Sequence, residues 1–272
     1  AELLAQTADR IQALGLADAG YRYINSDDCW ASLGRDNHTG RIRSAFFPDS
    51  NDGGDAGMRN LSRYIHGKNL LFGLYGAASE VTCAKREGNL YHEMIDAQTL
   101  ADWGVDYFKY DACGEDNLQA YAKFQVMRDA LNATGRAIVY SFEPHGSSPY
   151  DPVVWPRQTG NSWRTGHDIR AGFGAILAAA HEANAWAHAG GPGGWPDADM
   201  LEVGNPGLSV VESRSHFALW CLIKSPLLIG CDLATINASF LEILTNRELI
   251  ALSQDPLGQP GWLRNTTAGP DP

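Results

Sequence analysis

The sequence of 272 residues has no apolar run long enough to cross a membrane. Its longest largely apolar stretch, residues 171–189, is broken by His181, Glu182 and Asn184, whereas a spanning helix needs about 20 predominantly apolar residues. Basic residues are also few, with 21 Lys and Arg against 32 Asp and Glu and a net charge of −11. Because anionic surfaces repel such a chain, we predict no nucleic-acid partner and no membrane partner, and a neutral ligand fits better.

Metal-binding motifs are lacking as well. The sequence contains no CxxC pair and no HExxH motif, which argues against a zinc site. Residues 48–57, PDSNDGGDAG, faintly resemble a calcium loop but lack the glutamate of the twelfth position, so we interpret them as an insertion. Asp197 and Asp199, separated by one residue, resemble a pair of metal ligands. We predict neither a metal nor a cofactor.

The cysteine count is odd, and five glycosylation sequons are present. The cysteines are Cys29, Cys83, Cys113, Cys221 and Cys231, and the sequons begin at Asn37, Asn60, Asn132, Asn237 and Asn265. Five sequons favour a protein of the secretory pathway, extracellular or lysosomal/vacuolar, although several could remain unoccupied. Cys221 and Cys231 lie in apolar surroundings and are predicted to be buried thiols.

Short apolar runs alternate with helical patterns along the chain. Strands are predicted at Tyr21–Asn25, Leu70–Tyr75, Val105–Phe108, Ala137–Ser141, Ser162–Thr165, Met200–Val203 and Pro226–Gly230. Helices are predicted over residues 1–16, 58–67, 90–101, 121–131 (with Asp116 as N-cap), 168–189, 209–223 and 240–253. About seven strands alternating with helices predict an α/β protein, a (β/α)8 TIM-type barrel that lacks its first strand.

The stretch WGVDYFKYDACG, residues 103–114, organises this pattern. Its apolar run reads as a strand buried on both faces, and Lys109 and Asp111 stand where that strand ends. Active sites of parallel α/β proteins lie at the carboxyl ends of the strands, so these side chains are candidates for chemistry. The alternative is that Asp111 merely caps a loop.

Polar residues follow the first predicted strand in the same way. Asp27, Asp28 and Trp30 form a composition typical of sugar binding, in which carboxylates accept bonds from hydroxyls and an indole covers an apolar ring face. The alternative is a pair of helix-capping aspartates.

Five motifs together resemble the melibiase-type α-galactosidases of glycoside hydrolase family 27. They are YINSDDCW, YFKYDAC, SWRTGHDI, GGWPDADMLEVGN and SQDPLGQPG, and the resemblance runs from about Gly15 to Gly261. It implies a catalytic barrel over residues 1–255, with residues 256–272 as a linker toward a C-terminal β-sandwich that this sequence does not contain. It also implies that the first barrel strand would precede Ala1. In that case Cys29, whose partner in the family lies upstream, would be a free thiol.

The resemblance also implies a site and a mechanism. Asp111 would be the nucleophile and Asp168 the general acid/base of a retaining glycosidase that releases terminal α-linked galactose, with the two carboxyl groups about 5–5.5 Å apart. The residues implied to hold the sugar are Asp27, Asp28, Tyr75, Lys109, Glu143 and Arg164, with Trp30 nearby. Cys83 and Cys113 would form a disulfide under the pocket. Glu143 would contact the 2-hydroxyl, which favours galactose over N-acetylgalactosamine.

Several positions depart from the family pattern. Gly76–Ala78 lacks the usual aspartate, Arg170–Phe173 replaces acidic and Trp residues, Pro196 stands for Asn, and Phe142 and Pro144 flank Glu143. These departures keep three alternatives open: α-N-acetylgalactosaminidase activity, β-L-arabinopyranosidase activity, and a sugar-binding relative without turnover. The oligomeric state is left open.

Overall fold

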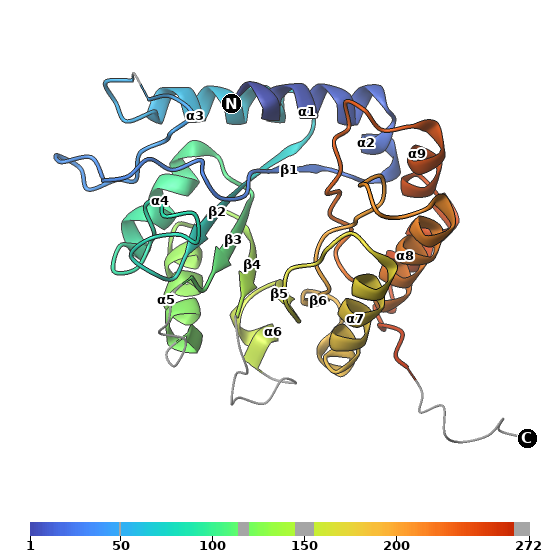
Figure 1. Ribbon diagram of the computed structural model, residues 1–272. Helices are drawn as coiled ribbons and strands as arrows, with labels where there is room; N and C mark the ends of the chain where they lie inside the picture. The colour runs from blue at the N-terminus through green and yellow to red at the C-terminus, as the bar shows by residue number, and fades with distance from the viewer. Residues whose placement is uncertain (49, 114–119, 145–154, 264–272) are drawn as a thin grey trace, which may run out of the picture. The chain divides into compact units, whose positions relative to one another are not determined.

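The computed structural model describes residues 1–48, 50–113, 120–144 and 155–263 (Figure 1). The chain divides into two compact units. The first unit comprises residues 1–151 and 155–163, and the second comprises residues 152–154 and 164–272. Each unit is described by itself.

The strands follow one another in a sheet in the order of the chain. They are β1 (Tyr23–Asn25), β2 (Leu71–Ala77), β3 (Tyr107–Asp111), β4 (Val139–Glu143), β5 (Ser162–Arg164) and β6 (Trp195–Asp197). From β1 to β5 every neighbouring pair is parallel. Parallel strands in sequential order, joined through helices, are the pattern of a β/α barrel wall, and the predicted α/β class is confirmed.

The register of the first unit places the polar strand residues on one face of the sheet. Tyr75 pairs with Lys109, and Asp111 pairs with both Ala77 and Glu143. Because side chains alternate along a strand and paired residues point the same way, Tyr75, Lys109, Asp111 and Glu143 share a face. The other face carries aromatic residues that pack against helices.

Helices cover that second face of the sheet. The helices of the first unit are α1 (Glu2–Ala13), α2 (Leu16–Ala19), α3 (Asp55–His66), α4 (Glu93–Trp103), α5 (Ala120–Ala133) and α6 (Trp155–Thr159). Helices α4 and α5 pack on each other beside β2–β4 (Figure 1). Phe124 of α5 stacks edge-on against Tyr110 of β3 and lies 5.2 Å from Phe142 of β4 between ring centroids. This aromatic layer fixes the strands that carry the polar residues.

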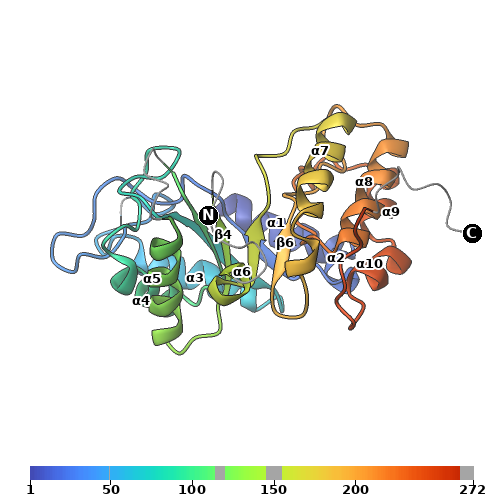
Figure 2. The ribbon, with the colours of Figure 1, turned by 90° about the horizontal axis from the view of Figure 1, so that it is seen from below.

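The second unit is built around one helix, α8 (Val210–Ile223), that buries one face. Its helical elements are α7 (Phe173–Asn184), the 3-10 helix η2 (Ala187–Ala189), α8 (Val210–Ile223), α9 (Ala238–Leu244) and α10 (Arg247–Ser253). Helix α8 contacts α7, α9 and α10 (Figure 2). It begins at a capping box, in which the side chains and backbone N–H groups of Ser209 and Glu212 bond reciprocally.

The strands predicted at Met200–Val203 and Pro226–Gly230 are wrong, because neither segment forms a strand. Met200–Val203 and Pro226–Gly230 meet only in an isolated parallel bridge between Leu201 and Ile229. Asp199 has a φ of 80°, which takes the backbone out of the extended region just before this segment, and Pro226 has no N–H to donate to a ladder. The strand of this region is β6, at Trp195–Asp197.

The helix predictions hold in outline but differ at several boundaries. The helix predicted over 168–189 starts only at Phe173, after Gly172 with its φ of 144°. The segment predicted as one helix over 240–253 is two, because Asn246 accepts bonds from two backbone N–H groups and starts α10. The helix predicted over 90–101 is α4, which starts at Glu93, and its apolar residue Met94 is 62 % exposed. The predicted N-cap Asp116 lies outside the described residues.

The cysteines outside the disulfide differ in their surroundings. Cys29 is an exposed free thiol, Cys221 is buried and Cys231 is half-buried. Burial raises the pKa of Cys221 to about 12 and that of Cys231 to about 11, so both remain protonated thiols at neutral pH. The predicted buried thiol is confirmed at Cys221.

None of the helices in the described part of the chain combines the length and apolarity that crossing a bilayer requires.

Candidate active site

Asp111, the last residue of β3, is buried and oriented by two hydrogen bonds. Its Oδ2 accepts from the Tyr75 hydroxyl at 2.7 Å and its Oδ1 from the backbone N–H of Ala112 at 2.7 Å. Only 5 % of Asp111 is exposed. Burial, followed by the charge of Asp111, raises the pKa of Tyr75, so the phenol stays protonated and donates. The carboxylate is therefore held in one orientation at the carboxyl end of the sheet.

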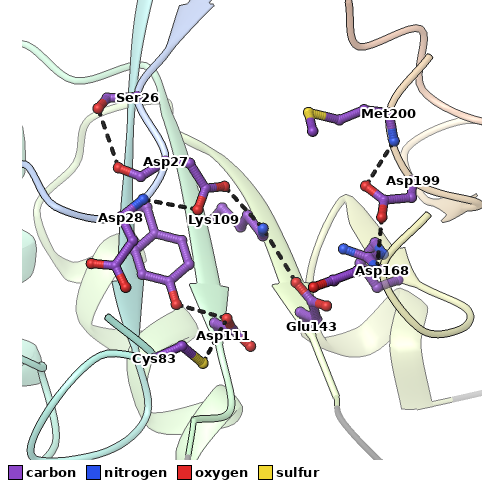
Figure 3. A network of polar contacts seen from close by, with 12 residues as sticks. Ser26, Asp27, Asp28, Cys83, Lys109, Asp111, Glu143, Asp168, Asp199 and Met200 are labelled. Carbon is purple, nitrogen blue, oxygen red and sulfur yellow. Dashed lines mark hydrogen bonds and ion pairs between the residues drawn. The ribbon is translucent and has the colours of Figure 1, made fainter. Parts of the chain in front are cut away.

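Lys109 lies between two carboxylates at the same end of the strands. Its Nζ is 3.0 Å from Oδ2 of Asp27 and 3.2 Å from Oε2 of Glu143 (Figure 3). Burial by itself would lower the pKa of Lys109, but the charges of Glu143 and Asp27 outweigh it and raise that pKa. Lys109 is thus an ammonium ion that links residues following β1 with residues of β3 and β4.

Asp28 holds the loop that follows β2. Its Oδ1 accepts from the Thr82 hydroxyl at 2.8 Å, and its Oδ2 accepts from the backbone N–H of Ala84 at 2.8 Å. These two residues flank Cys83, so Asp28 fixes the loop on both sides of that cysteine. Asp28, predicted as a sugar ligand, therefore also holds the disulfide loop.

The predicted disulfide between Cys83 and Cys113 is present, with a Cα–Cα distance of 5.1 Å. Both sulfur atoms lie 3.5 Å from Oδ2 of Asp111. Cys83, Asp111 and Cys113 form a group with metal-ligand spacing, but the cysteines are joined to each other and offer no thiolate. The disulfide instead packs against the Asp111 carboxylate.

Trp30 departs from its predicted role. The side chain is 2 % exposed, and its indole Nε1 donates to the backbone oxygen of Tyr75 at 2.6 Å. Its ring packs edge-on against Trp103. An indole enclosed in this way has no face to offer to a sugar ring, so Trp30 supports Tyr75 from behind.

Arg164 organises a second group of acidic residues, in the second unit. One nitrogen, Nη2, lies 2.9 Å from Oδ1 of Asp168 and 2.9 Å from Oδ2 of Asp199 (Figure 3). Arg164 is 5 % exposed, whereas the side chain of Asp168 is 80 % exposed. Arg164 ends β5, and Asp168 stands in the loop that follows, because Gly172 delays the start of α7. A buried cation thus anchors an accessible carboxylate.

The predicted site residues therefore fall into two sets. The first unit brings together Asp27, Tyr75, Lys109, Asp111 and Glu143, and the second brings together Arg164 and Asp168. The first unit also has a surface hollow near the amino ends of β1–β3, lined by Tyr23, His66 and Asp106 among others. None of the predicted site residues lines this hollow.

One buried network behind the site was not predicted. The Arg35 guanidinium holds both oxygens of Asp96 at 2.6 and 2.8 Å, and Asn89 donates to Asp96 at 2.8 Å. Asn89 also accepts from the backbone N–H of Ala77 at the end of β2. A Cβ at Gly76 would come within 2.2 Å of Asn89 Oδ1, so the network requires glycine at this position. These residues are far apart in sequence, and the only local signal was an aspartate on the buried side of α4.

Comparison with known proteins adds independent evidence. The family model described as alpha galactosidase A matches residues 1–255. The chain is 45 % identical over 260 residues to alpha-galactosidase 3 of Arabidopsis thaliana, covering 95 % of this chain and 57 % of that protein. The chain therefore spans less than two thirds of the length of this relative.

Solved structures agree with the sequence match. A putative alpha-galactosidase/melibiase of Bacteroides fragilis superposes with a TM-score of 0.88 at 35 % identity, covering 97 % of this chain and 59 % of that one. The α-galactosidase of Saccharomyces cerevisiae, solved with raffinose, gives a TM-score of 0.86 at 35 % identity, over 95 % of this chain and 61 % of that one. With this fold and the match over residues 1–255, the chain belongs to the melibiase-type α-galactosidases of glycoside hydrolase family 27.

Proposed function

We propose that the protein is a retaining α-galactosidase that releases terminal α-linked galactose from oligosaccharides or glycoconjugates by double displacement. The observation that carries this proposal is the oriented carboxylate of Asp111, bonded to Tyr75 and Ala112 at the carboxyl end of β3. A retaining glycosidase needs such a carboxylate to attack C1 and form a covalent glycosyl-enzyme.

Asp168 is proposed as the general acid/base. The role needs a carboxyl group that gives a proton to the leaving oxygen and later takes one from water. The side chain of Asp168 is 80 % exposed and is anchored by Arg164 at 2.9 Å. Exposure supports proton exchange with solvent, and the anchor supports a fixed direction.

The polar residues around Lys109 are proposed to bind galactose. A lysine ammonium has three donors, and two point to Asp27 and Glu143, so one is left for a sugar hydroxyl. Asp27, whose side chain is 63 % exposed, can accept from a hydroxyl. Because the yeast relative was solved with raffinose, α-galactosides of that kind are the first substrates to test.

The test is turnover of p-nitrophenyl α-galactoside by the full-length protein and by Asp111→Asn. Asn at this position has the same shape, its oxygen can accept from the Ala112 N–H and its amide nitrogen can donate to the Tyr75 hydroxyl, so the fold is expected to survive while turnover falls to background. Asp129→Asn removes a carboxylate of the same unit that pairs with its neighbour Arg128 on the surface, and it should behave as wild type. Normal turnover by Asp111→Asn would overturn the role of Asp111.

The stereochemical course tests the mechanism separately. A retaining enzyme releases α-galactose first, which NMR detects before the sugar mutarotates. Release of β-galactose first would contradict double displacement. Wild-type protein that binds galactose in calorimetry but turns over no α-galactoside would instead support the alternative of a sugar-binding relative.

The neighbouring activities of the family are separated by substrate. Glu143, buried and paired with Lys109, favours α-galactosides over α-N-acetylgalactosaminides, because an N-acetyl group would meet a carboxylate where it needs room. A β-L-arabinopyranosidase would prefer p-nitrophenyl β-L-arabinopyranoside in the same assay. Higher kcat/KM on either substrate than on the α-galactoside would replace this proposal with the corresponding activity.

A secretory location is proposed with the function. The Cys83–Cys113 disulfide fits an oxidising compartment, and the sequon asparagines Asn37, Asn60, Asn132 and Asn237 are all exposed. Expression in a eukaryotic host, followed by treatment with an N-glycosidase, should lower the apparent mass. A mass unchanged by that enzyme would count against glycosylation.

A further inference from the structure

Asp199 is a carboxylate of the second unit that contacts Arg164 and the backbone N–H groups of Ile169 and Met200. Its Oδ2 lies 2.9 Å from Nη2 of Arg164 and accepts from the backbone N–H of Ile169 at 2.8 Å. Its Oδ1 accepts from the backbone N–H of Met200 at 2.7 Å (Figure 3). The side chain is 10 % exposed, so these contacts form away from bulk water.

The backbone of Asp199 is also held in an unusual conformation. Its φ of 80° is in the left-handed region, which costs energy for residues other than glycine and is best tolerated by Asn and Asp. Three features support it: the backbone N–H donates to Oδ1 of Asp197 at 2.8 Å, the carbonyl accepts from the Trp220 indole at 2.7 Å, and Trp220 is fully buried. The surrounding structure therefore aims this carboxylate in a fixed direction.

The Asp199 carboxylate points toward Ile169, the residue after Asp168, and toward Arg164, the ion-pair partner of Asp168. Asp199 bonds the residue directly after Asp168 through the N–H of Ile169, and it shares with Asp168 the same nitrogen of Arg164. The same Nη2 also lies 3.4 Å from the carbonyl oxygen of Gly166, so the two carboxylates and this loop carbonyl surround one nitrogen. Removing Asp199 would free the loop at position 169 and take one negative charge away from Arg164.

We propose that Asp199 is a positioning residue for the acid/base Asp168: it fixes the Asp168 loop and takes a share of the Arg164 charge. The inference rests on the proposed function. A general acid has to carry a proton before it can assist the leaving group, and a neighbouring arginine favours the ionised form, whereas a neighbouring carboxylate opposes it. Because Asp199 pairs with Arg164, the positive charge of Arg164 stabilises the ionised form of Asp168 less, and Asp168 can carry the proton that a general acid needs.

The role is tested by the dependence of rate on the leaving group. An activated leaving group such as 2,4-dinitrophenolate departs without a proton, whereas the sugar of melibiose needs one. In full-length Asp199→Asn, we expect kcat/KM to fall about 10- to 100-fold for melibiose, within the contribution of general acid catalysis, and less than about threefold for 2,4-dinitrophenyl α-galactoside. Asn tolerates the backbone φ of 80°, so the change removes charge without adding backbone strain.

Two further variants sharpen the test. Asp232→Asn changes an exposed carboxylate of the same unit that accepts from the Ala234 N–H and the Thr235 hydroxyl in the turn after it, and both substrates should be hydrolysed as by wild type. In an Arg164→Gln background, Asp199→Asn should change the ratio of the two rates less than in wild type, because the charge that it shares is gone and only its bond to the Ile169 N–H is affected. If Asp199→Asn does not fold, Asp199→Glu, which keeps the charge, should retain the wild-type ratio of the two rates.

Equal losses on both substrates, with or without a lower melting temperature, would show a merely structural role and overturn the inference. A changed ratio of the rates in Asp199→Glu would also overturn it. Failure of the proposed function is seen separately, because wild-type protein would then hydrolyse neither substrate.

Discussion

The hydroxyl of Tyr75 donates to Oδ2 of Asp111 across neighbouring strands, although 36 positions separate the two residues in the chain. The bond exists because β2 and β3 pair in parallel with Ala77 opposite Asp111, two residues beyond Tyr75 on the same face. The indole of Trp30 holds the backbone of Tyr75 from the other side. Position and protonation of the phenol are thus set by buried neighbours.

Removing this hydroxyl should weaken the nucleophile without unfolding the protein. For Tyr75→Phe in the full-length protein, we expect kcat/KM on p-nitrophenyl α-galactoside to fall about 10- to 100-fold, since a hydrogen bond to a charged group contributes about 1.5–3 kcal/mol. Tyr64→Phe is the matched control, because Tyr64 donates to Asp9 on the exposed surface. Activity of Tyr75→Phe within twofold of that control would contradict the role of the bond.

The disulfide should support both stability and the site. It closes a loop with a sequence separation of 30 residues, and loop-entropy arguments give about 3–4 kcal/mol for a crosslink of that span. Urea unfolding of Cys83→Ser/Cys113→Ser should show this loss, together with reduced turnover, because both sulfurs contact Asp111. A reductant should lower wild-type stability and leave the double variant unchanged; equal sensitivity of the two proteins would exclude the disulfide as the cause.

His216 should make stability fall as the pH becomes acidic. Its Nε2 accepts from the backbone N–H of Glu202 at 2.9 Å, which requires the neutral imidazole, and burial lowers the pKa of His216 to about 4. The unfolded chain binds a proton near pH 6.5 and the folded chain does not, so this contribution is full above about pH 6.5 and is lost down to about pH 4. The shift corresponds to about 3 kcal/mol.

The measurement is the free energy of unfolding of wild type and His216→Gln between pH 7 and pH 4. Glutamine can still accept the Glu202 N–H but does not titrate. The variant should show a flatter pH dependence by up to about 3 kcal/mol over this range. Parallel curves for the two proteins would show that His216 is not the titrating group.

Glu143 should set the preference at the 2-position of the sugar. Wild-type protein should prefer p-nitrophenyl α-galactoside over the α-N-acetylgalactosaminide by at least about 100-fold, and Glu143→Ser should reduce that ratio at least about tenfold by making room for the acetyl group. Because Glu143 also pairs with Lys109, lower absolute rates are expected for the variant, and the ratio is the quantity that tests the role. Comparable wild-type rates on both substrates would contradict the assignment.

Much of the fold followed from local patterns. Apolar runs bounded by polar residues gave the first five strands, because a strand buried on both faces must be continuously apolar and its end must return to water. The same logic placed Lys109, Asp111 and Glu143 at the carboxyl end of the sheet. Local patterns were less reliable where the backbone has a positive φ. Asp199 has one, and it directly precedes the strand that was expected at Met200–Val203.

The sequence by itself determined the family, the alternation of strands and helices, and which polar residues close the strands, since these depend on residue type and spacing. Only the tertiary structure decided which of them meet. Strand register joined Tyr75 to Asp111, and Lys109 to Asp27 and Glu143. Packing buried Trp30, and loop closure set Asp199 beside Arg164. These contacts join residues about 35 to 80 positions apart, and no local propensity specifies them, because they arise when the elements dock.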